Sequence, residues 1–481
     1  MTRTTYLVSR LMRPVALAVL ALPLLQPVLA AETDAMKVVQ APLLRLPAPG
    51  ASYQDPVFGT TVVRAANPAD FGTKQLRPEY SQLQAWNADG SLMLLNSELI
   101  VDAKTYALVH KVDYRWPGFG HALRWSPTDP RKLYFIGGGL GGCNDAGLYE
   151  YRLDSGSPVA GSPVLVRCFA EYQRLYKDQS FEEISDDGRV IALVGRKAAA
   201  NKWGYVNEAF AYDISAGVKH RPLELPVDAT WGPQTGDFVA ASPSGKFVLI
   251  QFPAGTARLR GLEAFDLDMN YVGKVHTGSG HGDFVRDSSG TEWAVIDNAN
   301  NAYLFSGAHY IVKAKIPSGV LFDAAGNVDR EATANAGLTV RLLELDWSHH
   351  LHVSCRNILS PSSCVFVTYQ TQEGYDNGWQ PFEMEIVQLG LDSTFTSPKV
   401  VRLVHHRSVP YSVAPRDSCP GKQNYWAQPH ATVRPDGRQV AFGSNWGRIC
   451  EADEPVDLFV ADIAPTSTVV RPMTPKDFAV N

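Results

Sequence analysis

Histidine and glutamine recur at one place in a repeated sequence pattern. The place lies eight positions before a series of turn-forming dipeptides, and its occupants are Ser81, His121, Gln179, Gly236, His281 and Gln428. His430 follows Gln428 by two residues, which puts both on one face of an extended strand. Imidazoles transfer protons near neutral pH and bind metals, so these positions are candidates for acid–base or metal chemistry.

A second polar set lies in the segment 348–356, Ser-His-His-Leu-His-Val-Ser-Cys-Arg. Strand alternation predicts one shared face for His350, His352, Ser354 and Arg356. Arg356 would then place a fixed cation near the histidines. A histidine at a strand start is also an ordinary hydrogen-bonded structural residue, and that alternative stays open. The run 405–407, His-His-Arg, is interpreted as a solvated loop rather than a basic cluster at the rim.

The elements that position these residues form an internal repeat. Each copy is an alternating strand, a tight turn and an apolar strand, with turns at Asp89-Gly90, Asp129-Pro130, Asp187-Gly188, Ser244-Gly245, Ser289-Gly290 and Asp436-Gly437. A weaker copy has 360–369 as its second half. Seven hairpin copies predict an all-β fold, a single β-propeller of seven blades, with six or eight still open. The segment 323–336 is the best candidate for a helix or loop insertion.

The chain ends and composition indicate an exported protein. Residues 1–30 have the basic start, short apolar run and small residues of a signal peptide. We expect an N-terminal segment at 31–75, with a ring-closing strand near Thr61 to Arg64 beside a last strand at Val456 to Ile463. The propeller then covers 76–465 and a tail 466–481. The net charge of −5 disfavours nucleic acid as a partner, no later segment predicts membrane insertion, and a monomer is expected.

Six cysteines in an exported chain predict disulfides. Proximity in sequence favours the pairs Cys143–Cys168, Cys355–Cys364 and Cys419–Cys450, among the connectivities that six cysteines allow. A zinc site is disfavoured because the sequence has no Cys-x-x-Cys pair.

The turn sequences resemble those of TolB-like propellers over most of the chain. A closer resemblance is to exported propellers of the oligogalacturonate lyase and ulvan lyase type, carried by the segments Asp55–Thr60, Trp86–Ser91, His405–Ser408, Pro429-His430, Pro435–Gly437 and Ser444–Gly447. These families cleave uronic-acid glycans by β-elimination. The resemblance therefore implies an acidic oligo- or polysaccharide as partner and a periplasmic or secreted location.

The resemblance also implies site residues. Oligogalacturonate lyases hold a divalent metal, usually manganese, with histidines and a glutamine in the motif Gln-x-x-His-x-His. Here Tyr425 and Gln428 stand in place of the glutamine and the first histidine, and His430 matches the last. We expect His281, His430 and Gln428 as ligands of Mn, Ca or Zn. Ulvan lyases use His, Tyr and Arg, for which His121, Tyr425 and Arg356 are the candidates.

The expected elimination assigns a role to each candidate. His121 is the predicted base, Tyr425 the acid and Arg356 the cation for the carboxylate, with His352, Arg124 and Gln179 as substrate contacts. The alternative is a non-catalytic periplasmic propeller for binding or assembly, as in TolB-like proteins. A glycoside hydrolase ranks last, because it needs two opposed carboxylates and Asp283 is the only obvious acid at such a position.

Overall fold

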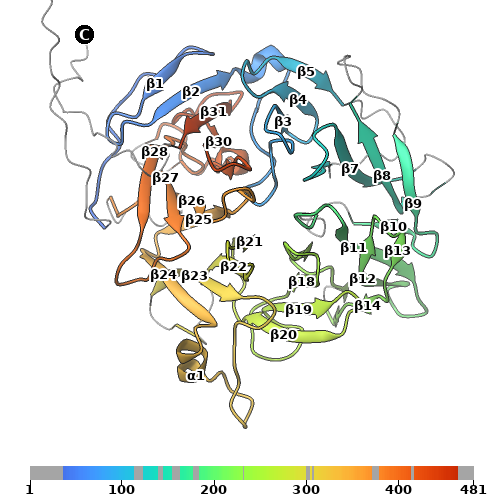
Figure 1. Cartoon of the computed structure of the whole chain (residues 1–481). Helices are drawn as coiled ribbons and strands as arrows, with labels where there is room; N and C mark the ends of the chain where they lie inside the picture. Colours follow the sequence, from blue (N-terminus) through green and yellow to red (C-terminus); the bar gives the residue numbers. More distant parts are fainter. Residues whose placement is uncertain are drawn as a thin grey trace, which may run out of the picture.

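The strands form a ring of seven blades around a central axis, the predicted β-propeller (Figure 1). The computed structural model describes residues 36–112, 123–138, 143, 145–153, 163–176, 184–230, 232–298, 304–305, 308–370, 379–412 and 417–463. The predicted signal peptide and tail lie outside these residues, and so do His121 and Gln179.

Blades 1 to 3 follow one another along the chain. Blade 1 consists of β3 (Leu92–Leu95), β4 (Leu99–Asp102) and β5 (Leu108–Lys111), with Trp86 bridged to Met93 on the inner side. Blade 2 consists of β6 (Arg124–Trp125), β7 (Lys132–Gly137), β8 (Gly147–Arg152) and β9 (Val164–Cys168). Blade 3 consists of β10 (Arg174–Leu175), β11 (Val190–Ala198), β12 (Tyr205–Asp213), β13 (Val218–Lys219) and β14 (Leu223–Glu224).

Blades 4 to 6 are regular four-stranded antiparallel sheets. A small sheet of β15 (Val227–Asp228) and β16 (Gly232–Pro233) precedes them. Blade 4 consists of β17 (Phe238–Ala241), β18 (Phe247–Gln251), β19 (Leu262–Asp266) and β20 (Tyr271–His276). Blade 5 consists of β21 (Gly282–Arg286), β22 (Glu292–Asp297), β23 (His309–Lys315) and β24 (Thr339–Leu345). Blade 6 consists of β25 (His349–Ser354), β26 (Ser363–Gln370), β27 (Glu385–Gly390) and β28 (Val400–His405).

Blade 7 joins the two ends of the chain. Its strands run in the order β1 (Ser52–Gln54), β2 (Thr61–Ala66), β31 (Asp457–Asp462), β30 (Gln439–Ser444) and β29 (Thr432–Val433). Strand β2 pairs with β31 in antiparallel register, with Val62 opposite Ala461. The ring is therefore closed by hydrogen bonds between strands far apart in sequence.

Helical structure is sparse. The helix α1 (Arg330–Asn335) lies in the predicted insertion 323–336 and projects from the ring between β23 and β24 (Figure 1). Asp329 caps it by accepting a hydrogen bond from the Ala332 amide at 2.8 Å. Two short 3-10 helices, η1 (Pro68–Phe71) and η3 (Tyr425–Ala427), precede the inner strands of blades 1 and 7.

The core consists of apolar clusters between neighbouring blades, one for each of the seven contacts around the ring. In β3, Leu92 and Leu94 pack toward blade 2, whereas Met93 and Leu95 pack toward blade 7. Both faces of such a strand are buried, so its four residues are all apolar although side chains alternate in direction. Each sheet needs both neighbours to cover it, and the ring supplies them.

The two faces of the ring differ in what they present. The inner strand of a blade is the one nearest the central axis, such as β21 or β25. Each inner strand begins at one face of the ring, here named the loop face. It leads to a hairpin turn at the opposite face, here named the turn face. At the turn face Gly90 and Gly437 have φ of 71° and 73°, a backbone conformation that the Asp-Gly pairs of the repeat accommodate without strain. Residues just before or early in the inner strands therefore converge at the loop face.

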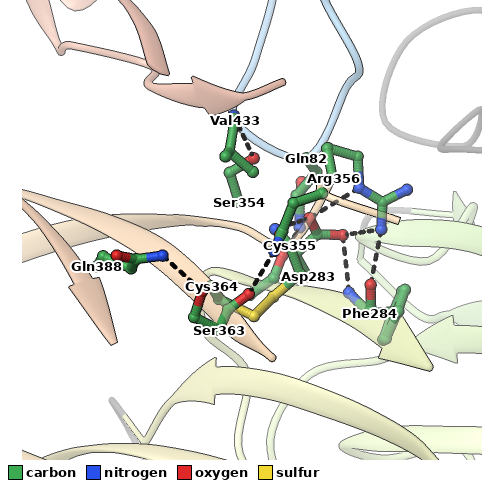
Figure 2. The surroundings of a disulfide bond; sticks show 12 residues. Gln82, Asp283, Phe284, Ser354, Cys355, Arg356, Ser363, Cys364, Gln388 and Val433 are labelled. Atoms are coloured by element: carbon green, nitrogen blue, oxygen red, sulfur yellow. Dashed lines mark hydrogen bonds and ion pairs between the residues drawn. A yellow bond between two sulfur atoms is a disulfide. The ribbon is translucent and has the colours of Figure 1, made fainter. Parts of the chain in front are cut away.

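The three predicted disulfides are all formed, Cys143–Cys168, Cys355–Cys364 and Cys419–Cys450. Figure 2 shows the second, which ties the end of β25 to β26 inside blade 6. Three disulfides indicate the oxidising environment of an exported protein. In the described part of the chain, no helix has the length and apolar character needed to cross a membrane.

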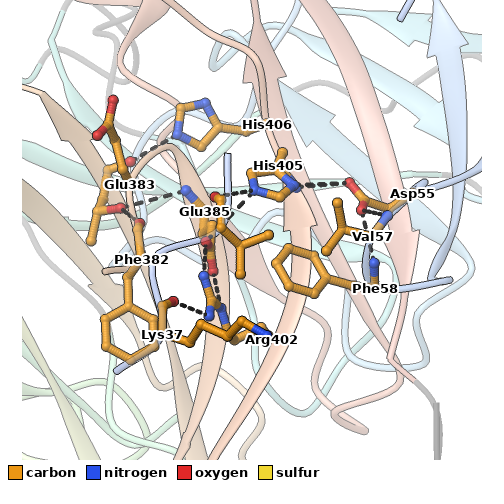
Figure 3. A network of polar contacts seen from close by, with 12 residues as sticks. Lys37, Asp55, Val57, Phe58, Phe382, Glu383, Glu385, Arg402, His405 and His406 are labelled. Atoms are coloured by element: carbon orange, nitrogen blue, oxygen red, sulfur yellow. Dashed lines mark hydrogen bonds and ion pairs between the residues drawn. The ribbon is translucent and has the colours of Figure 1, made fainter. Parts of the chain in front are cut away.

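A buried charge network fastens the N-terminal segment to blade 6 (Figure 3). His405 has no exposed surface and lies 3.6 Å from a carboxylate oxygen of both Asp55 and Glu385. Arg402 donates to the other Glu385 oxygen at 2.6 Å and to the Lys37 carbonyl at 2.7 Å. Burial would raise the pKa of Asp55, but His405 and Arg407 outweigh it and hold that pKa below its ordinary value.

The interpretation of 405–407 as a solvated loop is therefore wrong. His405 and His406 are fully buried and Arg407 nearly so. His406 Nε2 donates to the Thr368 carbonyl at 2.8 Å, and its Nδ1 accepts from the Ser408 amide at 3.0 Å. The polar sequence is buried because it is matched by carboxylates and carbonyls from segments far away in the chain, which no local pattern reveals.

Ring closure gives a test at adjacent residues of β2. We expect Val62→Ala to lower the free energy of unfolding by about 2 kcal/mol, because Val62 is fully buried between blades 6 and 7. Thr61→Ala is the control, since Thr61 is exposed one position earlier in the same strand. Urea unfolding followed by tryptophan fluorescence measures both. Equal stability of the two variants would contradict a closing role for β2.

Candidate functional site

Three histidines from three blades meet at the loop face. His281 immediately precedes β21, His352 lies within β25, and His430 precedes β29 by two residues. The ring centroids of His281 and His352 are 4.6 Å apart, and those of His352 and His430 are 4.9 Å apart. This group is named here the histidine cluster. His281 and His430 lie just before their inner strands and His352 lies within one, and the packing of these blades brings the three rings together.

The hydrogen bonds of the cluster leave several ring nitrogens available. His281 Nδ1 donates to the Leu351 carbonyl at 2.7 Å, so its Nε2 carries the lone pair in the neutral ring. His352 Nε2 donates to Gln428 Oε1 at 3.1 Å, which leaves its Nδ1 as the acceptor. His352 Nδ1 and both nitrogens of His430 are buried, and within the described ranges they have no hydrogen-bond partner. Buried unpaired nitrogens are costly, and a bound ligand would give these atoms the partners that they lack.

Burial keeps two rings of the cluster uncharged. Desolvation lowers the pKa of His352 and of His430 well below the ordinary histidine value, and each ring's neighbours in the cluster lower it further. Both imidazoles are therefore neutral at physiological pH. A neutral imidazole has a lone pair, so it can accept a proton or bind a metal.

The backbone of His430 is unusual. Its φ is 29°, on the left-handed side that non-glycine residues seldom occupy. The preceding segment is fixed by η3, where Asn424 caps the Trp426 amide, and by the Pro429 carbonyl, which accepts from Gly443. Backbone strain of this kind is concentrated at functional sites, because the surrounding structure must hold it in place.

Aromatic side chains surround the three rings. The Tyr80 centroid is 5.1 Å from both His352 and His430, and Tyr369 stacks on His352 at 5.2 Å. Tyr425, half exposed, lies 5.2 Å from His430. Burial raises the pKa of Tyr369 and of Tyr425, so both phenols are protonated at neutral pH. A protonated phenol at the opening, such as Tyr425, can donate a proton.

Arg77 is an arginine whose charge acts on His430. Its guanidinium stacks on Trp426 at 3.8 Å, and its Nη1 donates to the Pro78 and Glu79 carbonyls at 2.8 Å. Its charge contributes to the lowered pKa of His430, after desolvation and His352. Arginine stays protonated in proteins, so this side chain brings a permanent positive charge to the cluster.

The structure places Arg356 elsewhere than predicted. Its Nε and Nη2 donate to the two oxygens of Asp283 at 2.9 and 2.6 Å, and Nη2 also donates to the Phe284 carbonyl (Figure 2). It lines a small cavity with Leu359 and Pro435 near the turn face. Burial raises the pKa of Asp283 to about 6 against the pull of Arg356, so the carboxylate is ionised at neutral pH.

The reason is distance along the strand. Alternation does put Arg356 and His352 on one side of the chain, but four residues of strand separate them by roughly 13 Å. The prediction of a free Arg356 cation beside the histidines is therefore wrong. Asp283 and Arg356 instead join blades 5 and 6 as a buried ion pair.

The structure brings together five of the predicted site residues, His281, His352, Tyr425, Gln428 and His430. Gln428 lies between His352 and Tyr411, whose hydroxyl is 3.4 Å from Gln428 Nε2. Arg124 is buried in blade 2, where its Nη1 donates to the Leu123 carbonyl. Sequence analysis missed Tyr80 and Arg77, although Tyr80 directly precedes Ser81, the marked position of the first copy.

The cluster fits a divalent metal in its donor chemistry. Neutral imidazoles and the Gln428 amide oxygen are ligands that Mn and Zn accept, and the unpartnered nitrogens of His430 would gain a partner. Within the residues that the structure covers, however, no three His, Cys, Asp or Glu side chains already stand in a metal-holding arrangement. At least one ring would therefore have to turn for all three to bind one ion.

No protein-family description matches the chain, and no curated protein sequence matches it. Solved structures resemble it weakly. Hydrazine synthase from Kuenenia stuttgartiensis has 12% identity and a TM-score of 0.39, covering 82% of this chain and 96% of that one. The β-propeller domain of the trilobed protease from Pyrococcus furiosus has 11% identity and a TM-score of 0.39, covering 79% and 95%. The GH74 xyloglucanase from Xanthomonas campestris has 13% identity and a TM-score of 0.38, covering 79% and 54%.

The Asp283–Arg356 pair gives a test of its structural role. We expect Arg356→Met to lower the free energy of unfolding by about 3 kcal/mol, because it leaves the Asp283 carboxylate buried without its cation. Arg286→Met, an exposed arginine at the end of β21, should change stability by less than about 0.5 kcal/mol. Thermal and urea unfolding measure both. If the two variants were equally stable, the ion pair would not hold blades 5 and 6 together.

Proposed function

We propose that the protein is a polysaccharide lyase that cleaves uronic-acid glycans by β-elimination at the histidine cluster. The observation that carries the proposal is the meeting of three imidazoles from three blades, of which His430 is buried with both nitrogens unpartnered. The nitrogens of His349 are also unpartnered among the described residues, so the meeting of three rings supports the site more strongly than missing partners alone. The resemblance of the sequence to oligogalacturonate and ulvan lyases supports the same chemistry.

Elimination from a uronate has three requirements. A base removes the proton on the carbon next to the carboxylate, a cation stabilises the negative charge that develops on that carboxylate, and an acid protonates the leaving oxygen as the carbon–oxygen bond breaks. Tyr425 is the proposed acid, because its protonated phenol is half exposed beside His430. Arg77 replaces Arg356 as the proposed arginine cation. His121 remains the proposed base from its place in the repeat.

The proposed ligands of a divalent metal are His281, His352 and His430, with Gln428 holding the ring of His352 in place. When bound, such a metal would supply Lewis-acid stabilisation of the uronate carboxylate. The protein's own residues orient these ligands: the Leu351 carbonyl fixes the ring of His281, and Gln428 fixes that of His352. Tyr80 and Tyr369 cover the rings and exclude water from them.

The surroundings favour a sugar acid as substrate. Tyr425 and Trp426 expose 51% and 39% of their surface beside the cluster, and exposed aromatic faces of this kind stack on sugar rings. The chain as a whole carries a net charge of −5, so an anionic substrate depends on cations placed locally, such as Arg77. We propose a periplasmic or secreted location, where such polysaccharides are met.

The proposal is tested with a panel of polysaccharides that includes polygalacturonate, ulvan and alginate. We expect at least one to yield an unsaturated uronate, followed by its ultraviolet absorbance, with activity lost after chelation and restored by Mn. His352→Phe keeps the ring shape but removes both nitrogens, so kcat/KM should fall about a hundredfold or more. Tyr425→Phe should lower kcat by at least about tenfold by removing the acid.

The matched control is His220→Phe, on the outer side of blade 3 beyond β13, which should leave activity unchanged. Metal analysis of the same samples should find one divalent ion in the wild type and less in His352→Phe. No unsaturated product from any polysaccharide, with folded protein, would contradict the lyase and leave a non-catalytic binding propeller as the better account.

A further inference from the structure

A groove opens over blade 4 on the loop face, beside the histidine cluster. Its volume is about 670 Å³, and its walls are the segment leading into β17, the connection between β18 and β19, and Ser279. The polar side chains in it include Gln234, Asp237, Arg258 and Arg260. It is named here the blade-4 groove.

The inner end of the groove adjoins the cluster. Ser279 lies two residues before His281 in the segment that leads into β21. Gln251 Nε2 donates to the Phe252 and Gly278 carbonyls at 2.6 and 3.1 Å, which joins the groove wall to that segment. Partial burial raises the pKa of Asp237, and His281 lies within the electrostatic reach of this carboxylate. A chain-like ligand bound at the cluster can therefore continue into the groove.

A buried ammonium holds the outer wall in shape. Lys274 is 2% exposed, and its Nζ donates to the Ala257 carbonyl and to Glu263 Oε1 at 2.7 Å, as well as to the Arg260 carbonyl. These contacts use all three of its donors. Glu263 in turn accepts from the Leu259 amide at 2.9 Å. The segment 257–260 is therefore rigid although it is a surface loop.

Two arginines stand on this rigid wall. Arg258 stacks on Tyr271 at 3.6 Å and donates to Glu263 at 3.2 Å, with 47% of its side chain exposed. The stem of Arg260 packs against Gly255, where an added Cβ would lie 3.0 Å from the arginine Cβ. Arg260 is exposed, and in the described ranges no salt bridge or hydrogen bond involves its guanidinium. Its donors are thus directed to solvent from a fixed stem.

The opposite wall carries acceptors. Asp237 is exposed there, with Asp228 and Gln234 near it. A ligand that suits both walls must present an anionic group to the guanidinium groups and hydroxyl groups to the carboxylates. An acidic sugar has both kinds of group on one ring.

We propose that the blade-4 groove binds a further acidic sugar of the polysaccharide whose neighbouring unit occupies the histidine cluster, with Arg260 on its carboxylate or sulfate. This inference rests on the proposed function. Arg258 supports the same anionic group, and Asp237 accepts hydrogen bonds from sugar hydroxyls. The groove makes affinity depend on the length of the acidic chain.

Calorimetric titration tests the groove without turnover, in the inactive His352→Phe protein. The probes are disaccharide and hexasaccharide fragments of polygalacturonate, and the matching fragments of sulfated ulvan. We expect Arg260→Ala to weaken hexasaccharide binding about tenfold and to leave disaccharide binding unchanged. Arg438→Ala, an arginine with 81% of its side chain exposed at the turn face, is the control and should bind like the parent protein.

The outcomes separate the two proposals. If hexasaccharide binding depends on Arg260 but the wild-type protein cleaves no polysaccharide, the groove is supported and the lyase function is contradicted. If the wild-type protein cleaves a polysaccharide but Arg260→Ala binds the hexasaccharide as tightly as the His352→Phe parent does, the lyase function is supported and the groove is contradicted. Failure of every hexasaccharide to bind also overturns the groove. Polygalacturonate and ulvan fragments distinguish carboxylate from sulfate as the group that Arg260 recognises.

Discussion

Each blade of the ring is stable only because its neighbours bury both of its faces. Strands such as β3 are apolar on both faces, so no sheet of the ring can be stable alone, and each of the seven apolar clusters is shared by two blades. Closure through β2 and β31 covers the last pair. His281, His352 and His430 lie on the consecutive blades 5, 6 and 7, and the packing of these blades brings His352 into ring contact with each of the other two.

Charged groups inside the ring divide into those that the fold satisfies and those that it leaves available. Arg356 with Asp283, Lys274 with Glu263, and Arg402 with Glu385 are buried pairs, and each holds one segment to another. The histidine cluster differs, because burial keeps His352 and His430 uncharged and some of the nitrogens of the cluster have no partner within the described residues. Buried polar atoms that the fold does not satisfy are the ones that a ligand can satisfy.

The sequence predicted the strands and turns better than it predicted where individual side chains lie along the strands and how deeply they are buried. Asp-Gly turns and apolar alternation are local signals, so they predicted the blades, and sequence proximity predicted all three disulfides. The position eight residues before each turn dipeptide predicted that His281 and Gln428 belong to the site. Alternation specifies the side of a strand but not the distance along it, and Arg356 was misplaced for that reason. Arg77 and Tyr80 precede an inner segment without a regular strand, and the partners that bury His405 come from distant segments.

In the proposed function, three imidazoles from separate blades form one ligand site. Crystals grown with Mn²⁺ and measured near the manganese absorption edge test this site, because anomalous scattering locates the ion independently of the protein. We expect a single strong peak within bonding distance of nitrogens from His281, His352 and His430, with the rings turned toward it. A cluster without a peak, or manganese bound only by other residues, would contradict it.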